Sequence, residues 1–141
     1  TTWSRGLGDV YKRQAYTEFR TNNKDGYKFK KSYPYPTGEN TLGLNCLNDC
    51  NFNYPSKYSK FLLRGYGHVS TSSTKKGING LYDMGGNVWE WVDINDNSYK
   101  GTKGGSWWYG KNQMIQGYNA TKPKNMSAVY IGFRCVKDFK N

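Results

Sequence analysis

Hydrophobic and polar residues alternate in one short stretch in the second half of the chain. The segment NVWEWVD, residues 87–93, has the two-residue period of a β-strand. We therefore expect a strand here. Its period places side chains on two sides, with Val88, Glu90 and Val92 on one and Trp89 and Trp91 on the other.

Two further segments predict strands from their composition. They are TKGGSWW (102–108) and VYIGFRCV (129–136), the second of which is rich in β-branched and aromatic residues. The segment between them, 109–128, is polar and predicts irregular structure with one helical turn near 113–116.

The first half of the chain has little periodicity. The segment AYTEFR, residues 15–20, has helical propensity but is too short to be stable alone, so it predicts the end of a longer helix. Residues 21–76 are rich in Asn, Gly, Tyr, Ser and Pro and contain repeated turn signals. The whole pattern predicts a small, loop-rich α+β domain with short strands.

Length and charge narrow the class of protein. The 141 residues are enough for one domain, and the net charge of +11 is typical of proteins with anionic partners. The basic residues are scattered, however, and lysine outnumbers arginine, the residue that contacts phosphates and bases bidentately. We therefore expect no nucleic-acid partner. Because no apolar run approaches the roughly 18 residues that span a bilayer, we expect no membrane span either.

The opening of the chain differs in origin from the rest. The segment SRGLGDVYKRQ, residues 4–14, resembles a translated sequencing adapter, because its last six residues back-translate to a transposase end sequence. We therefore treat residues 1–14 as an artefact and expect the domain to occupy residues 15–141, with its natural N-terminus missing.

Cysteine and histidine are too few and too far apart for a zinc site. Cys46 and Cys50 have a C-x-x-x-C spacing, and the single histidine, His68, lies far from them, so a zinc site is not expected. The same spacing permits a disulfide between Cys46 and Cys50 in an oxidising compartment, which would leave Cys135 unpaired.

Two acidic residues flank a pair of glycines. Asp83 and Glu90 are separated by MGGNV, in which the glycines let the backbone fold back and direct carbonyl groups inward. Two carboxylates with backbone carbonyls form the oxygen shell that calcium prefers. An equally weighted alternative is that Glu90 pairs with a lysine or arginine and that Asp83 caps a turn.

The tryptophans also permit two interpretations. Trp89, Trp91, Trp107 and Trp108 favour core packing, which is the commoner use of tryptophan. Neighbours on a strand point to opposite faces, so we expect either Trp107 or Trp108 near the surface, where it would line a groove for a peptide or a sugar.

Four motifs occur in the order and spacing of a known family. They are YPYPTGEN with NCLND (33–40 and 45–49), GLYDMGGNVWEWV (80–92), KGGSWW (103–108) and IGFRCV (131–136). The chain resembles the formylglycine-generating enzyme, or sulfatase-modifying factor, family from Ala15 to about Lys137. The resemblance implies a variant C-type-lectin-like fold held by calcium, of which this chain is the C-terminal portion.

The resemblance also implies particular site residues. The family's calcium site corresponds to the side chains of Asp83 and Glu90 and the carbonyl groups of Gly86 and Val88. Cys135 corresponds to the family's structural cysteine. A ligand groove is implied at Trp89, Trp108 and Tyr109, with Ser106 at the position of the active-site serine, and the variable segment of this groove is residues 107–131.

The family's reaction oxidises a substrate cysteine to formylglycine and uses copper held by two cysteines that follow the GGS motif. Counted without gaps, those positions are Tyr109 and Met114 in this chain. A phenol and a thioether cannot replace two thiolates around Cu(I), so we expect no copper and no catalytic residues here.

Two functional hypotheses follow. The first is a calcium-stabilised binding or structural module without catalytic activity, in the periplasm or on the surface of a bacterium, with a protein, peptide or glycan ligand. The alternative is an oxidoreductase that generates formylglycine in sulfatases, or performs a related oxidation, with metal ligands in the missing half. We weigh the first above the second because the copper-binding positions are substituted.

Overall fold

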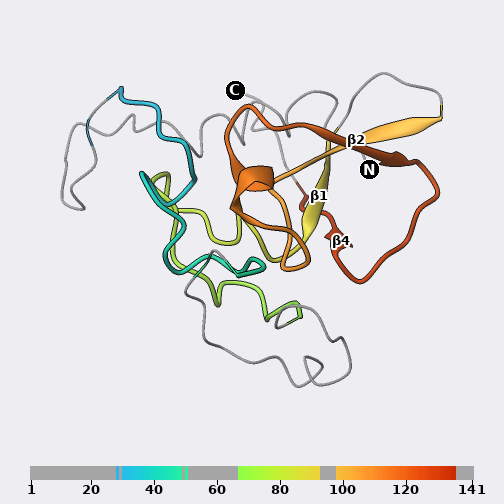
Figure 1. Cartoon of the computed structure of the whole chain (residues 1–141), viewed down its shortest axis with the longest axis horizontal. Helices are drawn as coiled ribbons and strands as arrows, with labels where there is room; N and C mark the ends of the chain where they lie inside the picture. The colour runs from blue at the N-terminus through green and yellow to red at the C-terminus, as the bar shows by residue number, and fades with distance from the viewer. Residues whose placement is uncertain (1–27, 29, 49, 51–66, 93–97, 136–141) are drawn as a thin grey trace, which may run out of the picture.

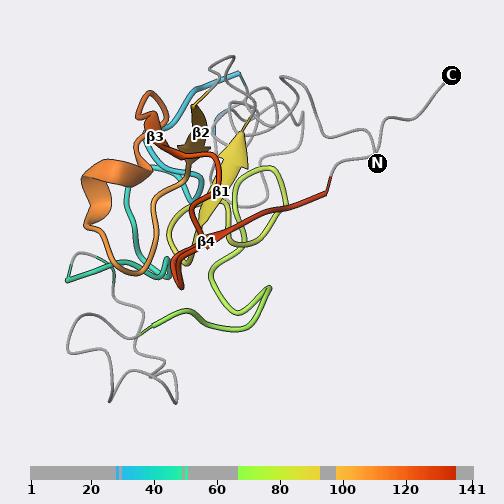
Figure 2. The same cartoon turned by 90° about the vertical axis from the view of Figure 1, so that its right-hand side faces the viewer.

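The computed structural model describes residues 28, 30–48, 50, 67–92 and 98–135. Within them, a four-stranded mixed sheet has the strand order β3-β2-β1-β4 (Figures 1 and 2). Its strands are β1 (Trp89–Val92), β2 (Tyr99–Lys103), β3 (Ala120–Pro123) and β4 (Ile131–Gly132), and one 3-10 helix, η1, spans Lys111–Met114.

The helical part of the predicted α+β class is not seen in these residues. The described segments contain no α-helix, and the helix expected at 15–20 lies outside them, as does the segment interpreted as an adapter. None of the helices in the described part of the chain is long and apolar enough to span a membrane.

Strand β1 lies inside the sheet and is the strand that the alternating pattern predicts. It pairs antiparallel with β2, with Glu90 opposite Lys103, and parallel with β4, with Glu90 opposite Gly132. Burial does not follow the alternation, because Trp89, Glu90 and Val92 are all buried while Trp91 is half-buried. Both faces of β1 are therefore covered by other parts of the chain.

The other strand predictions are correct only in part. The predicted strand 102–108 ends at Lys103, because Gly104 and Gly105 both adopt positive φ angles (93° and 70°) that leave the extended conformation. In the described part of the predicted strand 129–136, residues 129–135, only the two residues of β4 form a strand. The predicted helical turn near 113–116 is present as η1, displaced by two residues.

Strand β3 was not predicted. Its sequence, ATKP, contains one β-branched residue and ends in proline, so local preference does not favour a strand. Its four residues are extended because they pair antiparallel with β2. Pairing with a neighbour overrides weak local propensity here.

Two glycine turns meet beside the sheet and connect its loops. The amide of Gly86 donates to the carbonyl of Gly104 (2.7 Å), and the amide of Trp107 donates to the carbonyl of Asn87 (2.9 Å). Asn45 joins them through a parallel bridge to Gly86. The buried Asn87 side chain also exchanges hydrogen bonds with the backbone of Val69 (2.9 and 3.2 Å), so four loops share one connected centre.

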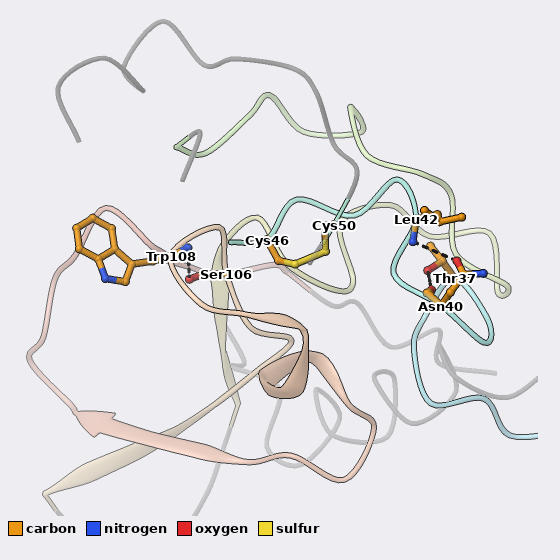
Figure 3. Close-up of a disulfide and its surroundings, with 7 residues drawn as sticks. All are labelled: Thr37, Asn40, Leu42, Cys46, Cys50, Ser106 and Trp108. Carbon is orange, nitrogen blue, oxygen red and sulfur yellow. Dashed lines mark hydrogen bonds between the residues drawn. A yellow bond between two sulfur atoms is a disulfide. The ribbon is translucent and has the colours of Figure 1, made fainter. Parts of the chain in front are cut away.

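A compact apolar cluster lies next to these turns. Cys46 and Cys50 form a buried disulfide (Figure 3). It packs with Leu44 and Met114, and the half-buried ring of Tyr35 lies against this cluster. Met114 reaches the cluster from η1 because glycine occupies position 105: a Cβ there would lie 2.7 Å from Cγ of Met114.

Candidate functional site

The turn between Asp83 and Glu90 brings both acidic residues to the edge of β1. Asp83, Gly86 and Asn87 have positive φ angles of 58°, 72° and 58°, so the chain reverses tightly just before the strand begins. The sequence predicts this reversal from the two glycines. The left-handed residues Asp83 and Asn87 extend it beyond them.

Asp83 uses its carboxylate to close a second turn. Oδ2 accepts the amide of Ser72 and Oδ1 accepts the hydroxyl of Thr74, both at 2.6 Å. The amide of Asp83 donates in return to Oγ1 of Thr74 (3.2 Å). This arrangement is the turn-capping alternative that the sequence left open.

Glu90 is buried and forms an ion pair with Arg134. Nε of Arg134 lies 3.0 Å from each carboxylate oxygen, and Nη2 lies 2.6 Å from Oε1. The same Nη2 donates to the carbonyl groups of Tyr82 (3.0 Å) and Asp83 (3.3 Å). One guanidinium therefore joins β1, the glycine turn and the residues after β4.

The ion pair with Glu90 changes the pKa of Arg134. Burial alone would lower the pKa of Arg134, but the hydrogen bonds and charge of Glu90, with the charge of Asp83, raise it above its ordinary value. The guanidinium therefore stays charged and balances the carboxylate, of which only 7% of the side chain is exposed.

The donors at this turn suit a hard cation in kind. Asp83 and Glu90 supply carboxylates, and the turn supplies carbonyl groups at Gly86 and Val88. Among the described residues, no group of three or more His, Cys, Asp or Glu side chains gathers in one place. A calcium ion here would therefore depend on two carboxylates and on backbone oxygens, and would lie close to Arg134.

A second concentration of functional side chains lies on the other side of β1. Six aromatic rings form a connected cluster through five ring contacts between 4.9 and 6.2 Å. Trp89 contacts Tyr109 edge-on (5.5 Å) and Tyr118 at a tilt (6.2 Å), and Tyr130 contacts both Trp108 and Tyr109 (5.7 Å each). Trp107 packs edge-on beneath Trp108.

The structure divides the predicted groove residues into two pairs. Trp108 and Tyr109 are half-buried and present part of their surface. Trp89 and Ser106 are 1% and 0% exposed, so they cannot line an open groove, and this part of the prediction is wrong. Trp89 is covered because both faces of β1 are, and Ser106 is held inside, where its Oγ accepts the amide of Trp108 (3.3 Å, Figure 3).

The expectation that one of the paired tryptophans approaches the surface is correct, for a different reason. Trp107 is fully buried and Trp108 is half-buried, although the two residues lie in a turn and not in a strand. The two rings point in different directions because the chain turns after Gly105.

Lys122, which the sequence did not single out, completes the aromatic cluster. Its Nζ lies 5.6 Å from the ring centre of Trp89 and 5.3 Å from that of Tyr109, both within cation–π range. Burial raises the pKa of Tyr130, and the charge and hydrogen bond of Tyr109 raise it further, so the Tyr130 phenol stays neutral at physiological pH. No local motif marks Lys122, because β3 itself has no strand signal.

The positions where the resemblance requires copper-binding cysteines have packing roles. Tyr109 belongs to the aromatic cluster, and Met114 is 0% exposed beside the disulfide. Of the three cysteines, Cys46 and Cys50 are joined to each other, and Cys135 is an exposed free thiol just after β4.

The fold and these motifs agree with the comparisons to known proteins. The sequence profile of the sulfatase-modifying factor enzyme 1-like domain matches residues 11–139, so the chain belongs to this family. Its small mixed sheet with few helices fits the formylglycine-generating-enzyme-like variant of the C-type lectin fold.

Two solved structures are similar to the chain. The structure of CarF has a TM-score of 0.54 and 19% sequence identity, over 89% of this chain and 42% of CarF. Treponema denticola variable protein 1 has a TM-score of 0.45 and 20% identity, over 67% of this chain and 34% of that protein. The chain thus spans less than half the length of either, and no curated protein matches it.

Proposed function

We propose that this chain is a member of the sulfatase-modifying factor family that binds a ligand and does not generate formylglycine. One observation carries this proposal: the two positions that would hold copper in the family are a cluster tyrosine and a buried core methionine. Cu(I) in a two-coordinate site needs thiolates, and neither a phenol nor a thioether supplies one.

The aromatic cluster supports a binding role. Trp108, Tyr109 and Tyr130 are half-buried, and Tyr118 is 40% exposed, so aromatic surface remains accessible on a rigid set of ring contacts. Aromatic side chains offer large contact areas and lose little conformational freedom on binding. This surface, which includes part of the predicted 107–131 segment, is the proposed ligand site.

An assay for formylglycine tests the proposal directly. The chain is incubated with a sulfatase-derived cysteine peptide and Cu(I), and the peptide mass is followed, with an active member of the family as the positive control. We expect no conversion above the rate without protein, because two thiolates are missing at the reaction centre. Turnover that depends on the chain would overturn the proposal.

We also propose that calcium binds at the glycine turn, through the side chains of Asp83 and Glu90 and the carbonyl groups of Gly86 and Val88. The donor types and the tight reversal of the chain support this site. Asp83 accepts hydrogen bonds from Ser72 and Thr74, and Glu90 pairs with Arg134, so a calcium ion would share each carboxylate with these partners. When bound, calcium would add positive charge and cross-link the turn to β1.

Thermal unfolding with calcium and with a chelator tests this site. A ligand that binds only the folded state at a hundred times its Kd stabilises it by about 2.7 kcal/mol, which raises the Tm by roughly 5–10 °C for a domain of this size. We expect this rise for the wild-type chain and a much smaller one for D83N, with magnesium as the control ion. Equal Tm values in calcium and chelator would contradict calcium binding.

A further inference from the structure

Lys122 and the open rings form one continuous surface, which we call the aromatic–lysine face. It consists of Trp108, Tyr109, Tyr118, Tyr130 and Lys122, with the buried Trp89 beneath it. The ammonium of Lys122 is held over two rings, so it has a defined position and is not a freely moving surface charge. A fixed charge next to flat apolar rings is a feature that can select a ligand.

The charge on this face is reinforced by a neighbouring strand. Lys100 of β2 lies directly opposite Lys122 of β3 in the antiparallel register. Residues in this position point to the same side of a sheet, so Lys100 adds positive charge to the side on which Lys122 lies. The net charge of +11 would attract an anionic group to this face from a distance.

The cluster also contains a polar group that has no partner. The indole nitrogen of Trp89 is buried and has no hydrogen-bond acceptor among the described residues. Buried donors in native structures normally have an acceptor. Because this nitrogen lies beneath the face, a ligand on the surface does not reach it, and the preference for an anionic ligand rests on the charge of Lys122.

The shape of the surface favours a sugar over an extended peptide. Peptides often bind by adding a strand to a sheet edge, but β3, the edge strand next to this face, ends at Pro123, which has no amide hydrogen to donate. Flat ring faces instead suit the C–H groups of a pyranose, whose partial positive charge complements the negative face of an aromatic ring.

We propose that the aromatic–lysine face binds an acidic carbohydrate, a pyranose that carries a carboxylate, such as a uronic acid unit of a polysaccharide. The carboxylate pairs with Lys122, and the sugar ring packs on Tyr109 and Tyr118. This inference rests on the proposed binding function and gives its ligand a chemical class. The face shares Trp108 and Tyr109 with the predicted groove and adds Lys122, Tyr118 and Tyr130 to it.

Titration calorimetry with defined sugars tests the proposal. The probes are trigalacturonic acid, its neutral methyl ester, and an oligo-glutamate peptide of the same charge as the acid. We expect the wild-type chain to bind the acid at least about tenfold more tightly than the ester, since the ester cannot form the charge-assisted contact. Raising the salt concentration should weaken binding of the acid.

Two lysine variants separate a specific contact from general charge. K122Q removes the ammonium over Trp89 and Tyr109. K76Q removes the same charge from Lys76, which lies over the single ring of Tyr82 (5.6 Å) outside the face. We expect K122Q to lose about tenfold in affinity for trigalacturonic acid and K76Q to change it less than twofold, with circular dichroism and Tm confirming that both variants fold.

Each other result has a definite meaning. Equal losses in K122Q and K76Q, equal affinities for acid and ester, or no binding of either sugar would overturn the proposed ligand class. Binding of oligo-glutamate in preference to the sugars would overturn it in favour of an acidic peptide while leaving the binding function intact. Turnover in the formylglycine assay would instead overturn the proposed non-catalytic function, whatever the outcome of the sugar titrations.

Discussion

Replacing Gly86 with alanine should unfold the domain or leave it barely stable. Gly86 has a φ angle of 72°, and a Cβ built on it would lie 2.3 Å from the carbonyl oxygen and 2.9 Å from the carbonyl carbon of Asn45. These atoms are backbone and belong to the bridge that joins the two segments, so they cannot turn aside. We expect a loss of roughly 4 kcal/mol or more in the free energy of unfolding.

Variants at two other glycines separate the steric clash at Gly86 from the strain of an alanine with a positive φ angle. Gly80 has a similar φ angle of 85°, but its Cβ would meet nothing closer than Cε of Lys76 at 3.8 Å, so G80A should cost only about 1–2 kcal/mol of conformational strain. Gly117 has open space around it, and G117A should be close to neutral. Urea unfolding of the three variants measures the order, and a G86A value equal to that of G80A would show that the bridge to Asn45 yields easily.

The central turn and its strand are the parts of the fold that are most visible in the sequence. The glycine pair marks a reversal, and the alternation after it marks β1, because both signals are local and involve neighbouring residues. The strand ends and β3 are set by pairing between segments, which leaves little trace in residue order. The end of β2 is an exception, because a local signal ends it: Gly104 and Gly105 adopt positive φ angles inside the segment that was predicted as a strand to residue 108.

In the candidate sites too, local features could be predicted from the sequence and contacts between distant segments could not. Asp83 and Glu90 can be singled out from their spacing. Arg134, the partner of Glu90, is 44 residues away, in a motif whose composition predicts a strand. Lys122 is equally hidden, because its place over Trp89 and Tyr109 depends on β3. The resemblance to the family placed Trp89 and Ser106 in a groove, whereas their burial depends on how the surrounding loops pack, which a sequence motif does not show.

Replacing Arg134 with methionine should produce the second large loss of stability. Methionine keeps much of the apolar side chain but removes the guanidinium from a carboxylate that is 7% exposed. Breaking a buried ion pair from one side costs about 3–5 kcal/mol, because the remaining charge is left without its counter-charge. The carbonyl groups of Tyr82 and Asp83 lose a donor at the same time. Urea unfolding should give R134M a free energy of unfolding that is about 3 kcal/mol or more below that of the wild-type chain.

A double-mutant cycle with E90Q measures how much of this loss belongs to the pair. E90Q removes the buried charge itself and leaves the arginine, whose side chain is 33% exposed and therefore partly hydrated, so it should cost less than R134M. In the double variant E90Q/R134M both members of the ion pair are neutral, and part of the R134M loss should be recovered. Lys103, which is 6% exposed and lies opposite Glu90, loses a neighbouring negative charge in E90Q and in the double variant alike. Additive losses would show that the guanidinium acts mainly through the two carbonyl groups.

Calcium and Arg134 both supply positive charge to the same carboxylate, so the R134M variant also distinguishes their roles. If calcium binds Asp83 and Glu90, R134M should gain more stability from calcium than the wild-type chain does, because the ion then also replaces the missing counter-charge at Glu90. If R134M is less stable than the wild-type chain by the same amount with and without calcium, then Arg134, and not calcium, balances the charge of Glu90. In that case the turn that identifies the family is held together by a side chain from the end of the domain, where the resemblance would place a metal.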